Sequence, residues 1–201
     1  MSDRKYAGQR PPAMDPAGLA AEVRRRVSPG RFAHVEGVVQ AAAELARRWG
    51  VAEDKAVLAA WLHDVAKELP QDTLLKLADR FGIIFDDEMA HMPHLWHAPV
   101  GAELARREFG VGDPDVLAAV RHHPTGRAGM SPLERIVFLA DLIEPGRSFP
   151  GVDELRRLST EDLDAALLAA YDGLIRYVLD KGGLLHSDTV AARNEILLRR
   201  S

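Results

Sequence analysis

The 201-residue sequence contains no cysteine. This absence excludes disulfide bonds and thiolate metal sites, so any bound metal must have nitrogen and oxygen ligands. The N-terminal residues also lack the apolar core of a signal peptide, and no apolar run is long enough to span a bilayer. We therefore expect a cytoplasmic protein that has no membrane partner.

A basic excess is missing as well. The sequence has 26 Lys and Arg residues against 30 Asp and Glu residues, which gives a formal net charge of −4. Proteins that bind nucleic acids usually carry a surplus of basic residues, so this balance argues against a nucleic-acid partner. A local basic pocket for a small phosphate-containing ligand is compatible with it.

Sustained alternation of apolar and polar residues, the pattern of a strand, is also absent. Apolar residues instead recur at helical spacing between Pro and Gly breaks. The predicted helices cover about 15–27, 31–49, 53–69, 71–81, 96–109, 113–122, 132–144, 160–181 and 188–199, with a short helix or irregular structure over 82–93. The hydrophobic content of 47% is enough for one core. We predict an all-α helical bundle, with a flexible tail at residues 1–14 and a single domain over residues 15–201.

Two apolar runs contain charged or titratable residues that need a partner. His63 and Asp64 are adjacent in AAWLHDVAK, and Asp141 stands in IVFLADLIE. Burying an imidazole beside a carboxylate is costly unless something compensates, and a metal ion is the strongest partner available. These runs therefore favour a buried metal site.

Further histidines on other predicted helices or helix ends could complete that site: His34, His97 and His123. Side chains from facing helices of a bundle can converge on a cofactor. Taken alone, each of these histidines is more often an ordinary surface or core residue, and spacing does not decide whether His122 or its neighbour points inward. His91 and His94 precede His97 at three-residue intervals and offer an alternative metal-binding face, which the intervening Pro93 disfavours.

Imidazole and carboxylate ligands suit Fe, Mn, Zn, Co or Ni. A carboxylate can bridge two metal ions and an imidazole cannot, so Asp64 is the natural bridging ligand of a two-metal site. Two ions at bridging distance would share a hydroxide, which is a nucleophile at neutral pH and is placed for in-line attack on phosphorus. The ligand set therefore indicates metal-assisted phosphate-ester chemistry.

Several residues near these positions could bind phosphate. Lys67 lies about one helical turn beyond the His-Asp pair. The segment Thr125-Gly126-Arg127 offers backbone N–H groups and a guanidinium, and Arg147 follows a predicted helix end. Each could equally be solvated, as lysines and loop arginines often are. Trp96 or Phe149 could stack on a base, although core packing is the commoner fate of such residues.

These motifs resemble those of a known family. HxxxV at His34–Val38, HDxxK at His63–Lys67 and the later Asp141 resemble the HD-domain metal-dependent phosphohydrolases. The segments WHAPVGA, HPTGRAGM and FLADLIEPGRSFPGVDELR are more specific, and they are similar to the YqeK family of that superfamily, the bacterial symmetrical diadenosine tetraphosphate (Ap4A) hydrolases. The resemblance covers about residues 15–197. Pro124 departs from it, because the family commonly has Thr there.

The resemblance implies an all-α HD-domain fold whose core holds two divalent or trivalent transition-metal ions. The family's metal is iron, and the donor set is also compatible with Mn, Co, Ni or Zn. Carried over by motif position, the metal ligands are His34, His63, Asp64, His97, His123 and Asp141. The implied reaction is symmetric hydrolysis of Ap4A to two ADP, and the implied small-molecule partner is a dinucleoside polyphosphate or an ADP-like compound.

Catalytic roles are expected for Asp64, Lys67 and Arg127. Lys67 would neutralise the central phosphates together with the metals, and Arg127 would stabilise the charge of the departing ADP. Substrate binding is expected to use Lys67, Thr125, Gly126, Arg127 and Arg147.

Other readings stay open. One is a different HD-domain phosphohydrolase, such as a nucleoside monophosphate phosphatase or a (p)ppGpp hydrolase, with a single metal that needs neither His97 nor His123. Another is a non-catalytic nucleotide-binding module with a structural metal. The amphipathic C-terminal helices could also support a homodimer, and intramolecular packing explains them equally well.

Overall fold

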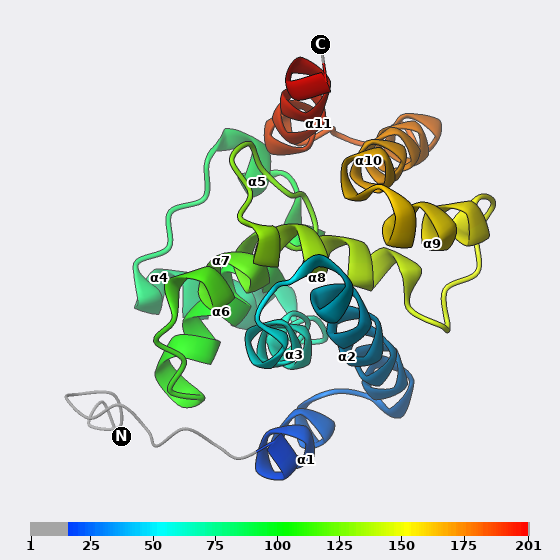
Figure 1. Cartoon of the computed structure of the whole chain (residues 1–201). Helices are drawn as coiled ribbons and strands as arrows, with labels where there is room; N and C mark the ends of the chain where they lie inside the picture. The colour runs from blue at the N-terminus through cyan, green and yellow to red at the C-terminus, as the bar shows by residue number, and fades with distance from the viewer. Residues whose placement is uncertain (1–15, 201) are drawn as a thin grey trace, which may run out of the picture.

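Helices account for every regular element of the computed structural model, which describes residues 16–200 (Figure 1). The helices are α1 (Pro16–Arg26), α2 (Pro29–Trp49), α3 (Glu53–Leu62), α4 (Gln71–Phe81), α5 (Asp87–Ala90), α6 (His97–Glu108), α7 (Pro114–His122), α8 (Pro132–Ile143), α9 (Val152–Glu161), α10 (Leu163–Asp180) and α11 (Ser187–Arg200), with a 3₁₀ helix, η2, at Pro93–Leu95. The predicted all-α class is confirmed. The predicted tail at residues 1–14 and the predicted helix start at residue 15 lie outside the described residues.

Local sequence signals set several helix boundaries. Ser28 caps α2 by accepting a hydrogen bond from the N–H of Arg31, and α2 ends at Gly50, whose φ of 67° favours glycine. Ser131 and Glu134 form a reciprocal capping box at the start of α8. These boundaries fix the ends of the two helices that contribute His34 and Asp141.

The prediction of one helix over 53–69 was wrong in its second half. The α-helix ends at Leu62, and residues 63–68 form turns in which each bond spans three residues, such as Lys67 N–H to the carbonyl of Asp64 at 2.9 Å. The carbonyl of Ala60, which an α-helix would offer to the N–H of Asp64, accepts a hydrogen bond from Nδ1 of His63 at 2.7 Å. The spacing of apolar residues could not predict this helix end, because it contains no information about a side chain that competes for a backbone carbonyl.

The predicted helix over 160–181 was also wrong at its start, because two helices meet there. Asp162 ends α9 and caps α10, with its carboxylate accepting from the N–H of Ala165 at 2.9 Å. Its φ of −145° is extended, so the chain changes direction at this residue. The helix α9 was not predicted.

The buried helix α8 lies at the centre of the packing. Helices α2, α3 and α7 pack on it from one side, and α9 and α10 pack on it from the other, with α11 against α10 (Figure 1). Phe138 of α8 stacks on the fully buried Tyr171 of α10, with ring centroids 4.6 Å apart. This arrangement brings α2, α3, α7 and α8 together on one side of the core, where they supply most of the predicted ligands.

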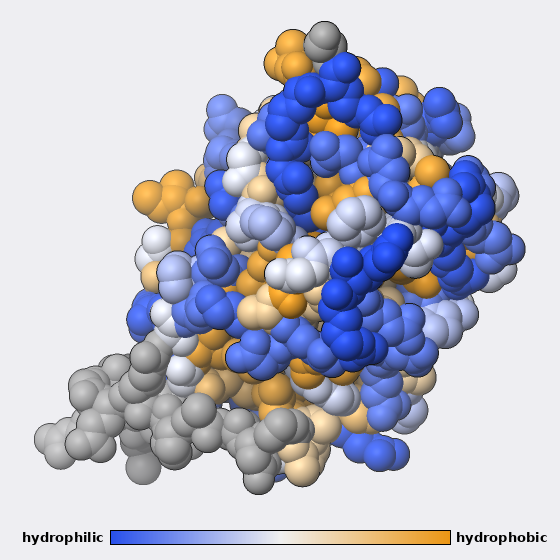
Figure 2. All heavy atoms as spheres, in the orientation of Figure 1, coloured by the Kyte–Doolittle hydropathy of each residue, from blue (hydrophilic) through white to orange (hydrophobic). Residues whose placement is uncertain are grey.

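The molecular surface in the view of Figure 2 is mainly hydrophilic, with apolar residues scattered among charged ones. None of the helices within residues 16–200 combines the length and the apolar character needed to cross a bilayer. The predicted cytoplasmic location and homodimer stay predictions.

Candidate metal centre

The six predicted metal ligands come together in the interior. They are His34 on α2, His63 and Asp64 just after α3, His97 at the start of α6, His123 just after α7, and Asp141 on α8. Four of them are almost fully buried, and His34 and Asp141 are partly buried. Polar groups are rarely buried together without a compensating partner.

The carboxylate of Asp64 lies between two pairs of imidazoles. Its Oδ2 atom lies 3.7 Å from Nε2 of His34 and 3.4 Å from Nε2 of His63. Its Oδ1 atom lies 3.3 Å from Nε2 of His97 and 3.5 Å from Nε2 of His123. Each oxygen therefore faces a different pair, which is the arrangement of a carboxylate that bridges two ions.

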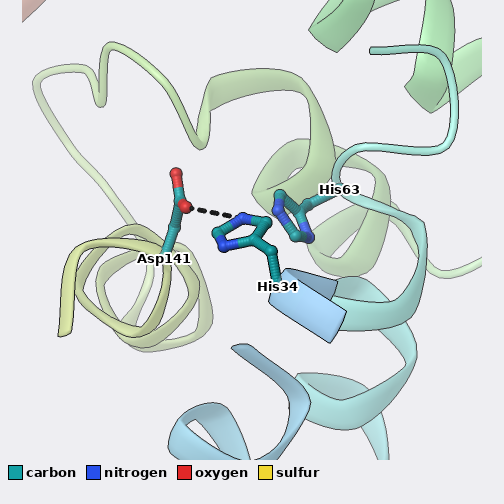
Figure 3. A group of neighbouring side chains, drawn as sticks. All are labelled: His34, His63 and Asp141. Carbon is teal, nitrogen blue, oxygen red and sulfur yellow. Dashed lines mark ion pairs between the residues drawn. The ribbon is translucent and has the colours of Figure 1, made fainter. Parts of the chain in front are cut away.

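Asp141 extends the first pair. Its Oδ1 atom lies 3.2 Å from Nε2 of His34, and in the view of Figure 3 the ring of His34 lies between Asp141 and His63. His34, His63 and Asp141 can each offer a ligand atom within 4.8 Å of the others, and so can His63, Asp64 and His123. Two overlapping ligand groups thus share this region.

All four imidazoles are held in the same way. Their Nδ1 atoms bond to Glu144 Oε1 (His34, 3.1 Å), Ala60 O (His63, 2.7 Å), His94 O (His97, 2.9 Å) and Val120 O (His123, 2.8 Å). A carbonyl or carboxylate acceptor places the proton on Nδ1 and leaves the lone pair on Nε2. The four Nε2 atoms are the ones that face Asp64, so the tautomers suit metal binding.

Three polar atoms at the centre of the cluster have no hydrogen-bond partner, so they show whether the site suits a metal ion. Nε2 of His34, Nε2 of His63 and Oδ1 of Asp64 are buried without a hydrogen-bond partner. Buried polar atoms are nearly always paired, so each such group calls for an explanation. Lone pairs of imidazole and carboxylate that converge in a dry site fit transition-metal ions.

The ionisation of the cluster follows from burial and close charges. Burial opposes ionisation of Asp64, yet His63 and the other close imidazoles hold its pKa well below the usual range. Burial opposes protonation of His63, but the Asp64 carboxylate raises its pKa. For His97, burial prevails and lowers the pKa to about 4. The carboxylate is thus ionised and His97 is neutral, as metal ligands must be.

Three cations surround the cluster. Nζ of Lys67 lies 3.4 Å from Nε2 of His97, and burial lowers the pKa of this lysine. Arg31 places Nη1 2.9 Å from Oδ2 of Asp64. Arg147 places Nη2 2.5 Å from Oδ1 of Asp141. Lys67 and Arg147 therefore lie beside the cluster, and their contact with phosphate stays a prediction.

Sequence reasoning missed Arg31 and Glu144. Arg31 lies three residues before His34 on α2, so helical spacing alone could have placed it on the ligand face. Glu144 is 4% exposed and accepts bonds from Nδ1 of His34 and from the N–H of Gly146. Gly37 makes room for it, because a Cβ there would lie 2.6 Å from the Glu144 carboxylate.

The loop after His123 is braced by other parts of the chain. The N–H of Gly126 donates to the carbonyl of His122 at 2.7 Å, and Thr189 on α11 donates to the carbonyl of Thr125 at 3.1 Å. Arg127 makes a two-point ion pair with the buried Glu134, at 2.7 and 2.9 Å. The hydrogen bonds of Arg127 thus hold the loop to α8, and its contact with phosphate stays a prediction.

The other histidines and the tryptophan considered in the sequence lie outside the cluster, whereas His123 belongs to it. His123 joins the cluster, whereas His122 lines a separate cavity. His91 bonds to the carbonyl of Asp87, and His94 is exposed, so the alternative histidine face is not assembled. The side chain of Trp96 is buried and donates to the carbonyl of Met89, as expected of a core residue.

Comparisons with known proteins agree with this geometry. The family model described as HD domain matches residues 31–146. The symmetrical bis(5'-nucleosyl)-tetraphosphatase of Bacillus subtilis (strain 168) is 41% identical over 175 residues, which cover 86% of this chain and 92% of that protein. The enzyme of the same name from Halalkalibacterium halodurans is 39% identical, with 89% and 95% covered.

A solved structure shares the whole fold. The crystal structure of a predicted HD superfamily hydrolase involved in NAD metabolism, from Clostridium acetobutylicum, aligns with a TM-score of 0.90 and 39% sequence identity. The alignment covers 93% of this chain and 99% of that one. The similarity therefore extends through the helices that follow the matched HD segment.

Proposed function

Because this chain belongs to the HD-domain family and, within it, groups with the symmetrical bis(5'-nucleosyl)-tetraphosphatases, we propose that it hydrolyses Ap4A to two ADP in a metal-dependent reaction. The observation that carries the proposal is the position of Asp64, whose two carboxylate oxygens face separate pairs of imidazoles. A one-metal phosphohydrolase would not need His97 and His123 at that carboxylate, so the two-metal reading is favoured.

The residues that would hold the ions follow from these contacts. His34, His63 and Asp141 would hold one ion, and His97 and His123 would hold the other, with Asp64 shared between them. Ions bound there would supply Lewis-acid neutralisation of phosphate oxygens and activation of a water at neutral pH. Iron is the metal that the family resemblance implies, and it suits the donor set.

The chain's own cations would bind the polyphosphate. Arg31 and Arg147 present guanidinium groups at Asp64 and Asp141, and Lys67 places its ammonium beside His97. Guanidinium groups form strong paired hydrogen bonds to phosphate oxygens. These three residues would orient the two central phosphates and offset charge that grows in the transition state.

The reaction balances with water as the only co-substrate. The water oxygen forms a bond to one of the two middle phosphorus atoms, and the bond from that phosphorus to the oxygen that links the halves breaks. The linking oxygen leaves with the second half, so each product is ADP and a proton is released. Symmetric cleavage requires one ADP half to be held so that its distal phosphate meets the centre.

Product identity tests the proposal. Metal-loaded protein, incubated with Ap4A, should yield ADP as the sole nucleotide product by anion-exchange chromatography. A mixture of ATP and AMP would contradict the symmetric reaction, and release of inorganic phosphate from nucleoside monophosphates in its place would favour another HD-domain phosphohydrolase.

A further inference from the structure

One guanidinium group closes the C-terminal end of α8. The last carbonyls of a helix have no partner within the helix, and here the side chain of Arg156 on α9 supplies one. Its Nε atom donates to the carbonyl of Ile143 at 3.0 Å, and its Nη2 atom donates to the carbonyls of Glu144 and Arg147, both at 2.9 Å. Arginine carries five N–H donors in a rigid planar fork, so this side chain fixes three carbonyls relative to one another.

The segment held in this way contacts two of the predicted metal ligands. The carboxylate of Glu144 accepts a hydrogen bond from Nδ1 of His34 at 3.1 Å. The guanidinium of Arg147 donates to the backbone carbonyl of Asp141 at 2.8 Å and to its Oδ1 atom at 2.5 Å. Arg156 therefore bonds to the backbone of both residues whose side chains reach these ligands.

The conformation of the segment changes at the residue that matters most. Glu144 has φ −50° and ψ 152°, so the chain leaves the helix at the residue whose carboxylate reaches a ligand. Pro145 has no N–H to donate, and Gly146 loses much conformational freedom when it is ordered. A turn of this composition is therefore stabilised by hydrogen bonds that come from another helix.

The helix that carries Arg156 is itself attached to α2. The indole N–H of Trp49 donates to the carbonyl of Ser159 at 2.8 Å, and Nε of Arg48 donates to the carbonyl of Thr160 at 2.8 Å. Both donors lie in the last turn of α2, and both acceptors lie in the last turn of α9. Helix α9 thus joins α2 to the end of α8, and each of those two helices carries a predicted ligand.

We propose that Arg156 is a positioning residue of the metal centre, which acts by holding Glu144 behind one predicted ligand and Arg147 against another. The proposal rests on the metal-dependent reaction proposed above, and the residue lies outside the matched HD segment at residues 31–146. A carboxylate behind a ligating imidazole orients the ring and raises its basicity. That support depends on the place of the carboxylate, which the backbone of Glu144 sets.

The effect should fall on one of the two proposed ions. Glu144 and Arg147 contact His34 and Asp141, which would both hold the first ion. The second ion would be held by imidazoles at the start of α6 and just after α7, whose Nδ1 atoms bond to carbonyls of their own segments. Removal of the Arg156 guanidinium should therefore weaken the first ion selectively, whereas general loosening of the fold would weaken both.

Calorimetric titration of metal-free protein with Mn²⁺ alone tests the proposal. Wild-type protein should bind two ions. Arg156→Ala should weaken one of them about fivefold, which is less than the roughly 10–100-fold cost of losing a direct partner of a ligand, and should leave the affinity for the other unchanged. Equal weakening of both ions, or no weakening of either, would overturn the positioning role.

Arg157 supplies the matched control on the same helix. Its side chain is 51% exposed and pairs with Glu154 and Glu161 of α9. Arg157→Ala removes the same charge from the same helix and leaves the end of α8 untouched, so both Mn²⁺ affinities should match those of the wild type. A loss equal to that of Arg156→Ala would attribute the effect to charge or helix stability and would refute the proposal.

Arg156→Lys covers the case in which Arg156→Ala does not fold. Lysine keeps the charge and the aliphatic stem, but its ammonium is a point charge that lacks the fork needed to reach three carbonyls. The same ion should therefore be weakened about twofold, with the other ion spared. Wild-type affinity for both ions in this variant would contradict the role of the three carbonyl contacts.

Failure of this inference is distinguishable from failure of the proposed function, because the titrations contain no nucleotide. If wild-type protein cleaves Ap4A to ADP and Arg156→Ala binds both ions as tightly as the wild type, the positioning role is wrong and the activity stands. If Arg156→Ala loses affinity for one ion selectively and wild-type protein does not cleave Ap4A, the positioning role stands and the proposed activity is wrong.

Discussion

The carboxylate of Glu144 accepts a hydrogen bond from Nδ1 of His34 at 3.1 Å. A carboxylate behind a ligating imidazole fixes its tautomer and raises its basicity, and loss of such a partner typically costs 10–100-fold in metal affinity. Glu144→Gln should therefore weaken metal binding about tenfold, measured by competition with a chelator of known affinity. The exposed Glu154→Gln is the control, and an unchanged affinity in Glu144→Gln would show that this contact does not support the site.

Asp64 is expected to be indispensable to both ions. Asp64→Ala removes the one carboxylate that faces all four imidazoles, so the purified variant should hold little metal and lose more than about 100-fold in kcat/KM. Its helical content by circular dichroism should match that of the wild type, because the helices are held by apolar packing. Retention of full metal content would refute the bridging role.

His97 separates a two-metal centre from a one-metal centre. Its Nε2 atom lies 3.3 Å from Oδ1 of Asp64 and 3.3 Å from Nε2 of His123. His97→Ala should reduce the metal content from two ions per chain to one, as measured by elemental analysis of protein purified without oxygen. A wild type with one ion, unaffected by this substitution, would instead support the one-metal alternative.

Lys67 is expected to act on the substrate and not on the metal. Its Nζ atom lies beside His97, and burial lowers its pKa because a poorly solvated place disfavours the charged form, which a nearby phosphate would stabilise. Lys67→Met should lower kcat by about 100-fold, as loss of one transition-state donor commonly does, while metal content stays at the wild-type level. Lys67→Arg, which keeps the charge, should recover part of the activity. A parallel loss of metal would reassign the residue to site assembly.

Gly126 should be required for stability. Its φ is +63°, and a Cβ there would lie 1.9 Å from the hydroxyl of the buried Tyr171. Gly126→Ala combines backbone strain with overpacking, so it should cost about 3 kcal/mol and lower the melting temperature by roughly 5–10 °C. Gly129→Ala is the matched control, since its φ is +71° but no neighbouring atom lies within 4 Å, and it should cost about 1 kcal/mol. Equal melting temperatures for the two variants would contradict the steric argument.

The sequence was sufficient to predict the class of fold and the six side chains that cluster in the core; their role as metal ligands stays a prediction. The adjacent His63 and Asp64 in an apolar run predicted a buried polar cluster, and the structure has that cluster although the helix around them ends at Leu62. Helix caps such as Ser131 and Glu134 were equally readable, because their signals are local. The family motifs supplied the order and identity of the more distant ligands.

What could not be predicted depends on contacts between segments far apart in the chain. Glu144 lies 110 residues from His34, so this pairing leaves no local signature, and helical spacing places Arg31 on the face of His34 without revealing its contact with Asp64, 33 residues away. The guanidinium and backbone N–H groups of the Thr125–Arg127 loop predict a phosphate contact for Arg127, and its pairing with Glu134 was not predicted. The separate cavity that His122 lines is formed by four segments far apart in the chain, so residue spacing could not predict it either.

Two hydrogen bonds join the loop after His123 to α11, which lies outside the matched HD segment. Thr189 holds the carbonyl of Thr125, and Glu195 holds the N–H of Gly129. The HD segment at residues 31–146 contains all six residues of the cluster, yet these two hydrogen bonds to the loop after His123 come from α11 (Ser187–Arg200). A chain shortened before α11 would therefore keep all six residues of the cluster but lose the two hydrogen bonds that hold the loop after His123.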